Sequence, residues 1–130
     1  MSDIIEIGNT RANPGTIAQG EIIVEKLAGG GNISIPITII NGINKGPCFW
    51  VNGGIHGDEP EGILTCSLLK KSINPQKLSG SVILTPVINV PAMEAAERGN
   101  PLDTFSYDMN RIYPGREDGY LSERIANIHK

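Results

Sequence analysis

Residues 48–64, CFWVNGGIHGDEPEGIL, contain the pattern that decides the fold. The continuous apolar run Cys48–Val51 is typical of a β-strand that is buried on both faces. The glycine-rich, polar residues 52–59 that follow are typical of a loop. Pro60 suits the first turn of a helix, because that position needs no amide hydrogen. We therefore expect a strand, a loop and then a helix over residues 60–72, with an apolar stripe formed by Ile63, Leu64, Leu68 and Leu69.

The segments around this unit predict a sheet. Ser81–Val90 (SVILTPVINV) has the composition of a buried strand and completes a β-α-β unit, which implies parallel strands. Upstream, Glu21–Leu27 and Ile33–Ile40 are expected to be strands, and Pro36 favours an edge position or a bulge. The first fifteen residues are expected to be irregular. The fold class is therefore α/β, with a mixed, largely parallel sheet and flanking helices.

The last segment predicts an amphipathic helix that follows a short helix after Pro91 and a long loop. Leu121, Ile125 and Ile128 lie on one face of this last helix. The sequence contains nothing further to cover that face, so we expect these side chains to pack on the sheet or to contact a second chain. The same observation leads us to expect that the sequence is truncated.

Composition excludes several classes of partner. The length of 130 residues fits one domain, and a net charge of −3 without a basic cluster argues against nucleic-acid binding. We expect no membrane span, since no apolar stretch approaches the roughly 20 residues that one needs. The start of the chain lacks the pattern of a signal peptide, and the two cysteines, Cys48 and Cys66, do not suggest a disulfide framework. We expect a cytoplasmic protein, and a homo-oligomer remains open.

His56 and Glu59 are candidate metal ligands. Imidazole and carboxylate are good zinc ligands, and the end of a parallel strand is where α/β sheets bind ligands. Glycines 53, 54 and 57 allow the backbone to bend sharply here. The alternative is an ordinary loop histidine followed by an acid at a helix start.

A second candidate site lies in the segment 108–115, DMNRIYPG. The planar guanidinium of Arg111 can bind a carboxylate through two hydrogen bonds, and Asn110 adds a directed amide. These two residues could hold the free carboxylate of an amino-acid substrate. The alternative is a surface arginine in a Pro-Gly turn.

Together, the run HGDEPEG and, about fifty residues later, DMNRIYPG resemble the succinylglutamate desuccinylase/aspartoacylase family, within the zinc carboxypeptidase group. The resemblance extends from about Glu21 to the end of the chain. It implies an amino-terminal portion of a zinc carboxypeptidase-like catalytic domain, with leading strands in 1–45 and the motifs in 46–130. It implies one zinc ion held by His56 and Glu59, a substrate clamp formed by Asn110 and Arg111, and Arg98 as the residue that polarises the scissile carbonyl. The implied reaction is hydrolysis of the amide bond of N-acyl amino acids.

The resemblance places the third zinc ligand and the general base in segments that this sequence does not contain. The remaining histidine, His129, falls in the last helix and is not expected to be a ligand. We therefore expect the chain as given to be weakly active or inactive. Two alternatives remain open, namely a carboxypeptidase acting on short peptides and a non-catalytic small-molecule binding module. The acyl group and the amino acid of the substrate cannot be deduced from the sequence.

Overall fold

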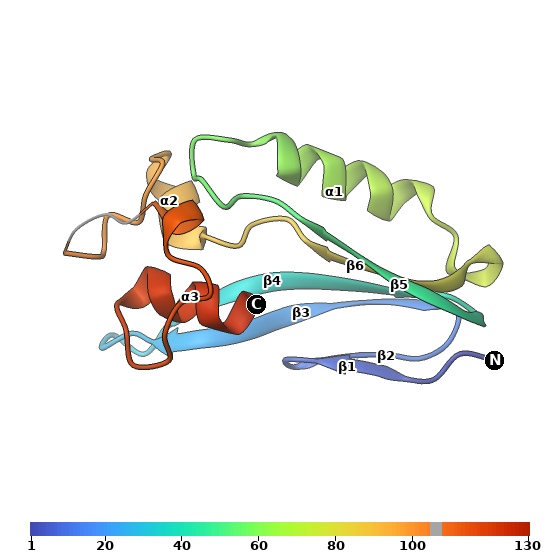
Figure 1. Cartoon of the computed structure of the whole chain (residues 1–130). Helices are drawn as coiled ribbons and strands as arrows, with labels where there is room; N and C mark the ends of the chain where they lie inside the picture. Colours follow the sequence, from blue (N-terminus) through green and yellow to red (C-terminus); the bar gives the residue numbers. More distant parts are fainter. Residues whose placement is uncertain (105–107) are drawn as a thin grey trace.

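The computed structural model describes residues 1–104 and 108–130 of the chain, and its elements form a sheet with helices and a hairpin around it (Figure 1). In chain order, the strands and α-helices are β1 (Ile5–Ile7), β2 (Thr10–Ala12), β3 (Thr16–Lys26), β4 (Asn32–Asn41), β5 (Asn44–Asn52), α1 (Glu61–Ser72), β6 (Ser79–Thr85), α2 (Val90–Ala95) and α3 (Leu121–His129). Two short 3₁₀ helices, η1 (Pro75–Lys77) and η2 (Met109–Arg111), complete the described elements.

The main sheet has the strand order β3-β4-β6-β5. Strands β5 and β6 pair in parallel and α1 connects them, so the predicted β-α-β unit is confirmed. The α/β class and the mixed sheet are confirmed as well. The pairs β3–β4 and β4–β6 are antiparallel, however, so parallel pairing does not predominate among the described strands. Strand β6 also ends at Thr85, five residues before the predicted end.

The first fifteen residues are not irregular as predicted, because β1 and β2 form a small antiparallel hairpin. The side chain of Asn41 in β4 donates hydrogen bonds to the backbone oxygens of Asp3 and Ala12, which holds the hairpin against the sheet. Pro36 pairs with Glu21 of β3 and lies outside the part of β4 that pairs with β6, which begins at Thr38. At Pro36, β4 is therefore an edge, as expected for a residue without an amide hydrogen.

Strand β5 is present where the sequence predicts it, but the prediction that it is buried on both faces is wrong. Phe49 is 66% exposed and Trp50 is 38% exposed. The reason is topological, since β5 is the last strand in the sheet order and pairs only with β6 among the described residues. The apolar run therefore predicted the strand correctly but not the exposure of its side chains.

Helix α1 begins after Pro60 as predicted, but only part of the predicted apolar stripe is buried: Leu69 packs against the core and Ile63 is partly buried. Leu64 and Leu68 are about two-thirds exposed, whereas Cys66 is buried. The cause is a glycine contact: a Cβ atom on Gly62 would lie 2.4 Å from the Cα atom of Gly53. This close approach places positions 62, 66 and 69 of α1 against β5 and the residue that follows it. A hydrophobicity pattern does not reveal such a contact between two backbones.

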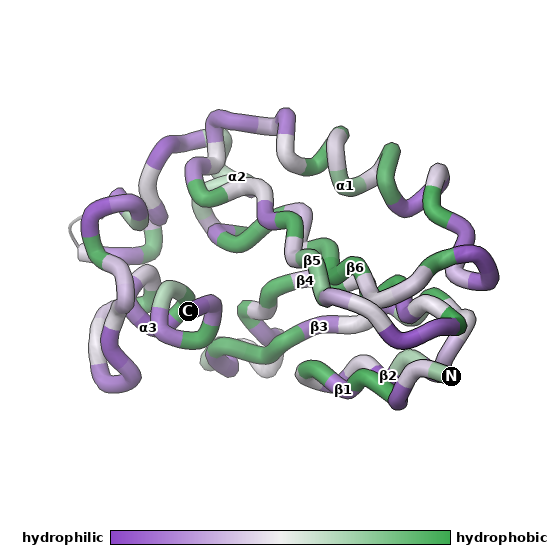
Figure 2. Tube along the Cα trace, turned by 45° about the vertical axis from the view of Figure 1, so that its right-hand side comes forward, coloured by the Kyte–Doolittle hydropathy of each residue, from purple (hydrophilic) through white to green (hydrophobic). Residues whose placement is uncertain are grey.

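The core lies on both faces of the middle strands. Figure 2 shows the hydrophobic stretches of β4 and β6 in the middle of the molecule, between α1 and the β1–β2 hairpin. Helix α3 covers the sheet through Ile125, which is buried with Ile35, while Leu121 packs at the margin and Ile128 stays 37% exposed. The predicted packing of this helix on the sheet is thus confirmed for Ile125. No helix among the described residues is both long and apolar enough to cross a membrane.

Candidate functional site

The loop after β5 places His56 at the carboxyl end of the parallel strand pair. Gly54 adopts a left-handed conformation with φ of +60°, which a residue with a side chain rarely adopts. Gly57 touches the backbone of α2, because a Cβ atom there would lie 2.0 Å from the carbonyl carbon of Ala92. These two glycines let the loop fold over α2 and leave His56 only 7% exposed.

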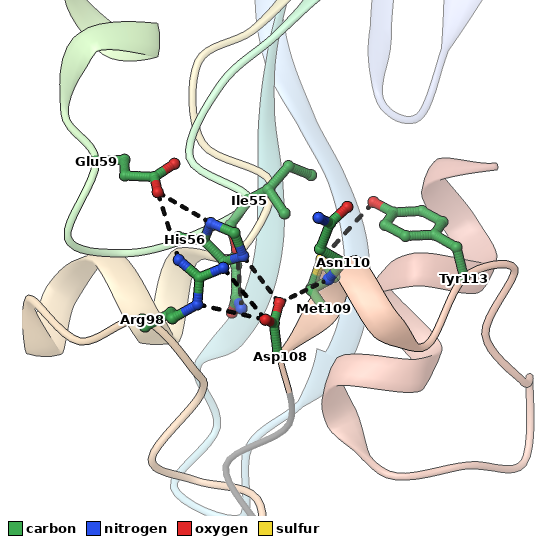
Figure 3. A network of polar contacts seen from close by, with 9 residues as sticks. Ile55, His56, Glu59, Arg98, Asp108, Met109, Asn110 and Tyr113 are labelled. Atoms are coloured by element: carbon green, nitrogen blue, oxygen red, sulfur yellow. Dashed lines mark hydrogen bonds and ion pairs between the residues drawn. The ribbon is translucent and has the colours of Figure 1, made fainter.

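Both ring nitrogens of His56 face carboxylates (Figure 3). Nδ1 lies 3.2 Å from Oε1 of Glu59, and Nε2 lies 2.8 Å from Oδ1 of Asp108. A neutral imidazole has one hydrogen, and the shorter contact indicates that Nε2 donates it to Asp108. The lone pair of Nδ1 then faces a carboxylate oxygen of Glu59, and a cation between the two atoms would satisfy both.

This arrangement fits a zinc ion. Two donors that bind one tetrahedral zinc at 2.0–2.2 Å lie roughly 3.3–3.6 Å apart, and the observed distance between Nδ1 of His56 and Oε1 of Glu59 is 3.2 Å, just below this range. A hydrogen bond from the other ring nitrogen to a carboxylate is the usual way in which proteins orient a metal-binding histidine. No group of three or more His, Cys, Asp or Glu in the described part of the chain could hold a metal together. Asp108 faces the opposite nitrogen and cannot share an ion with Nδ1.

Asp108 is a site residue that the sequence analysis missed. Its carboxylate accepts hydrogen bonds from Nε2 of His56, from the backbone amide of Asn110 and from Arg98. The bond from His56, with the help of Asn110 and Arg98, lowers the pKa of Asp108 to about 2. The carboxylate therefore stays charged at all physiological pH values. The one signal in the sequence is its place next to the Asn-Arg pair, which does not reveal the contact with His56.

Arg98 lies beside the two candidate ligands, although it comes from the loop after α2. Its Nη2 is 3.2 Å from Oδ2 of Asp108, and its Nη1 is 3.5 Å from Oε1 of Glu59. Figure 3 shows its guanidinium between these two carboxylates, next to the ring of His56. The Arg98 side chain is half exposed, so it remains accessible from solvent.

Asn110 and Arg111 lie in η2, directly after Asp108. Asp108 caps this turn through the amide of Asn110, and Met109 is fully buried, so the turn is attached at both of its first residues. Asn110 and Arg111 themselves are exposed. Within residues 1–104 and 108–130, the guanidinium of Arg111 has no ion-pair partner, which leaves it available to an external anion.

The structure thus brings the two sequence motifs into one site. Asp108 connects them, since it contacts His56 directly and carries Asn110 and Arg111 next to it in the chain. His129 lies elsewhere, with Nδ1 2.5 Å from the hydroxyl of Tyr113 and its ring against Trp50. The site therefore combines a histidine–carboxylate pair, an adjacent guanidinium and a second guanidinium that has no ion-pair partner among the described residues.

The chain is similar to several known proteins. The model of the succinylglutamate desuccinylase/aspartoacylase catalytic domain matches residues 45–129. The chain is 37% identical over 97 residues to the N-alpha-acetyl-L-2,4-diaminobutyric acid deacetylase of Halomonas elongata, covering 75% of this chain and 28% of that protein.

Solved structures are similar as well. A succinylglutamate desuccinylase/aspartoacylase from Rhodobacter sphaeroides superposes with a TM-score of 0.76 at 32% identity, over 85% of this chain and 34% of that chain. The product-bound ectoine utilization protein EutE from Ruegeria pomeroyi superposes with a TM-score of 0.72 at 30% identity, over 86% of this chain and 34% of that chain. The 130 residues thus span about a third of the length of these relatives.

Proposed function

Because the chain belongs to the succinylglutamate desuccinylase/aspartoacylase family, we propose that it supplies the metal pair and the substrate clamp of a zinc-dependent hydrolase of N-acyl amino acids. The observation that carries this proposal is the convergence of Nδ1 of His56 and Oε1 of Glu59 at 3.2 Å, with Nε2 of His56 bound to Asp108. Support for the substrate class comes from the relative named as a deacetylase of an N-acetylated amino acid.

In this proposal, His56 and Glu59 hold one zinc ion. When bound, zinc would supply Lewis-acid polarisation of the amide carbonyl and activation of water. Asp108 keeps the hydrogen of His56 on Nε2, so that the lone pair of Nδ1 points toward Glu59. The negative charge of Asp108 also increases the electron density on Nδ1, because the hydrogen on Nε2 is bound by an anion. Nδ1 would therefore be a stronger metal ligand.

Arg98 is proposed to stabilise negative charge on the carbonyl oxygen during the reaction. Its guanidinium lies 3.5 Å from Glu59 and is half exposed, so its hydrogens can reach an oxygen beside the metal pair. A fixed cation at the point where charge develops stabilises the transition state more than the substrate.

Asn110 and Arg111 are proposed to bind the α-carboxylate of the substrate. Arg111 can donate two parallel hydrogen bonds to the two carboxylate oxygens, and Asn110 can add a third. Because Asp108 links this turn to His56, the bound carboxylate lies at a defined distance from the scissile amide.

Hydrolysis also requires a base that accepts a proton from water. We assign none of the described residues to that role, nor to the third zinc ligand. Turnover by these 130 residues alone is therefore expected to be weak or absent. We further propose that residues 1–45 and 46–130 belong to one catalytic domain. We also propose that it works in the cytoplasm, where the free thiols of Cys48 and Cys66 would stay reduced.

The test is a binding titration of the zinc-treated chain with N-acetyl-L-alanine, N-acetyl-L-alanine methyl ester and the dipeptide Ala-Ala. We expect the free N-acyl amino acid to bind most tightly and the ester to bind at least tenfold more weakly. Tighter binding of the dipeptide would favour the carboxypeptidase alternative. Carboxylate binding that is unchanged by zinc, together with failure to bind zinc, would favour the non-catalytic binding module.

A further inference from the structure

The η2 turn, which carries the Asn110–Arg111 clamp, contacts an aromatic cluster that the proposed mechanism does not use. The contact is between the Tyr113 hydroxyl and the sulfur of Met109. The cluster consists of Trp50 from β5, Tyr113 and His129 from the end of α3. The His129 ring meets the Trp50 ring edge-to-face at a centroid distance of 5.2 Å, and the Tyr113 ring at 5.6 Å. The Tyr113 hydroxyl and Nδ1 of His129 share a hydrogen bond of 2.5 Å.

Burial disfavours the charged form of each partner of this hydrogen bond. Burial lowers the pKa of His129 and raises the pKa of Tyr113 to about 12. Within the described part of the chain, Nε2 of His129 is buried and has no hydrogen-bond partner, so the contact with Tyr113 is the only polar bond of the ring there. The position of His129 is therefore set by Tyr113 and by ring packing on Trp50.

Tyr113 lies two residues after Arg111, and further contacts fix the same segment on α3. Gly115 touches the helix backbone, because a Cβ atom there would lie 2.0 Å from the carbonyl oxygen of Glu123. Met109, at the start of η2, is buried with Ile125 of α3. The segment that carries Asn110 and Arg111 is thus attached to α3 on both sides of the clamp.

On its other side, Trp50 is tied to the loop that carries His56. Its indole N–H donates a hydrogen bond of 3.0 Å to the hydroxyl of Thr85, which is fully buried. The Thr85 hydroxyl in turn donates to Oδ1 of Asn52, the last residue of β5. The next residues form the loop with His56. Trp50 is therefore linked to the loop with His56 through Thr85 and Asn52, and to α3 through its ring contact with His129.

From this geometry we propose that Trp50, His129 and Tyr113 are positioning residues that set the spacing between the His56–Glu59 pair and the Asn110–Arg111 clamp. The proposal rests on the proposed function, since it takes those two groups to be the metal pair and the carboxylate clamp. Its consequence is specificity: the spacing selects substrates in which a carboxylate lies next to the scissile amide, as in an N-acyl α-amino acid.

The test uses the zinc-treated 130-residue chain and three variants, Tyr113→Phe, His129→Leu and His129→Gln. Each is titrated with N-acetyl-L-alanine, with its methyl ester and with zinc. Tyr113→Phe removes the hydroxyl that bonds His129 and the sulfur of Met109, and His129→Leu removes the first of these two bonds. We expect the free acid to bind roughly three- to tenfold more weakly to each variant. The affinities for the ester and for zinc should stay unchanged. His129→Gln should restore binding of the acid, because its side-chain amide can again form a hydrogen bond with the Tyr113 hydroxyl.

Equal losses for acid, ester and zinc would overturn the proposal, since they would indicate general destabilisation. A failure of His129→Gln to differ from His129→Leu would also overturn it. A second readout is independent of ligand and of folding yield: amide hydrogen exchange at Asn110 and Arg111, measured by NMR on the folded fraction. Faster exchange in Tyr113→Phe supports the proposal, and unchanged exchange contradicts it.

This design separates the two proposals. If the unmodified chain binds acid and ester equally, the clamp assignment in the proposed function is wrong. The exchange measurement at Asn110 and Arg111 still decides whether the aromatic cluster positions the turn. The fluorescence of Trp50, the only tryptophan in the sequence, gives an additional check that the cluster is assembled in each variant.

Discussion

Oδ1 of Asp108 lies 2.8 Å from Nε2 of His56, although 52 residues separate them in the chain. This contact joins the loop after β5 to the η2 turn. It also assigns different roles to the two ring nitrogens, because one is bound to a charged carboxylate and the other faces Glu59. Metal affinity at His56 should therefore depend on a residue that cannot itself reach the ion.

The first prediction concerns this contact. Asp108→Asn keeps the shape of the side chain but removes its charge, so we expect zinc affinity to fall about 10- to 100-fold, as for other such partners of metal-binding histidines. Competition with a chromophoric chelator measures the change. The control is Asp118→Asn, since Asp118 is largely exposed and pairs only with Arg116 among the described residues. Equal affinities of Asp108→Asn and the unmodified chain would contradict the assignment.

The second prediction has the opposite sign. Arg98 places a cation 3.5 Å from Oε1 of Glu59 and therefore competes with a metal ion. Half-exposed ion pairs contribute about 0.2–1 kcal/mol, so Arg98→Gln should raise zinc affinity about 1.4- to fivefold. The same chelator competition measures this, and the gain should shrink at high salt. A loss of zinc affinity would mean that Arg98 holds Glu59 in place.

The third prediction tests the clamp. Arg111→Lys keeps the charge but loses the planar fork of donors. We expect the affinity for N-acetyl-L-alanine to fall about tenfold, as one charge-assisted hydrogen bond is lost. The affinity for the methyl ester should not change, and isothermal titration calorimetry measures both. Arg116→Lys is the matched control on an exposed arginine. If Arg111→Lys weakens acid and ester alike, its role is structural.

The sequence predicted the elements of this site better than their contacts. The strand at 48–51, the loop with His56 and the helix after Pro60 follow from local patterns of hydrophobicity and glycine, and each is found. Asp108 could not be found in this way, because its role arises from a contact across the fold.

Local sequence patterns also could not predict which faces of α1 and β5 are buried. The exposed position of Leu64 and Leu68 follows from the contact between Gly53 and Gly62, which depends on two backbones meeting. The exposure of Phe49 follows from its place in the last strand of the sheet order, which hydrophobicity alone does not reveal.

The fourth prediction concerns Gly57. An added Cβ would lie 2.0 Å from the carbonyl carbon of Ala92, so Gly57→Ala must push the loop away from α2. We expect a loss of about 1–3 kcal/mol in unfolding free energy, and weaker zinc binding because His56 moves. Urea denaturation measures the first effect and chelator competition the second. Gly29→Ala is the control, since a Cβ there has no neighbour within 4 Å among the described residues. Similar behaviour of the two variants would contradict the packing role.

The most direct test of the central claim is X-ray absorption at the zinc edge on the zinc-loaded chain. We expect a shell of nitrogen and oxygen atoms at about 2.0–2.2 Å, with the outer scattering of an imidazole ring that disappears in His56→Gln. A sulfur shell at about 2.3 Å, from Cys48 or Cys66, would contradict the assignment of His56 and Glu59 as the metal pair.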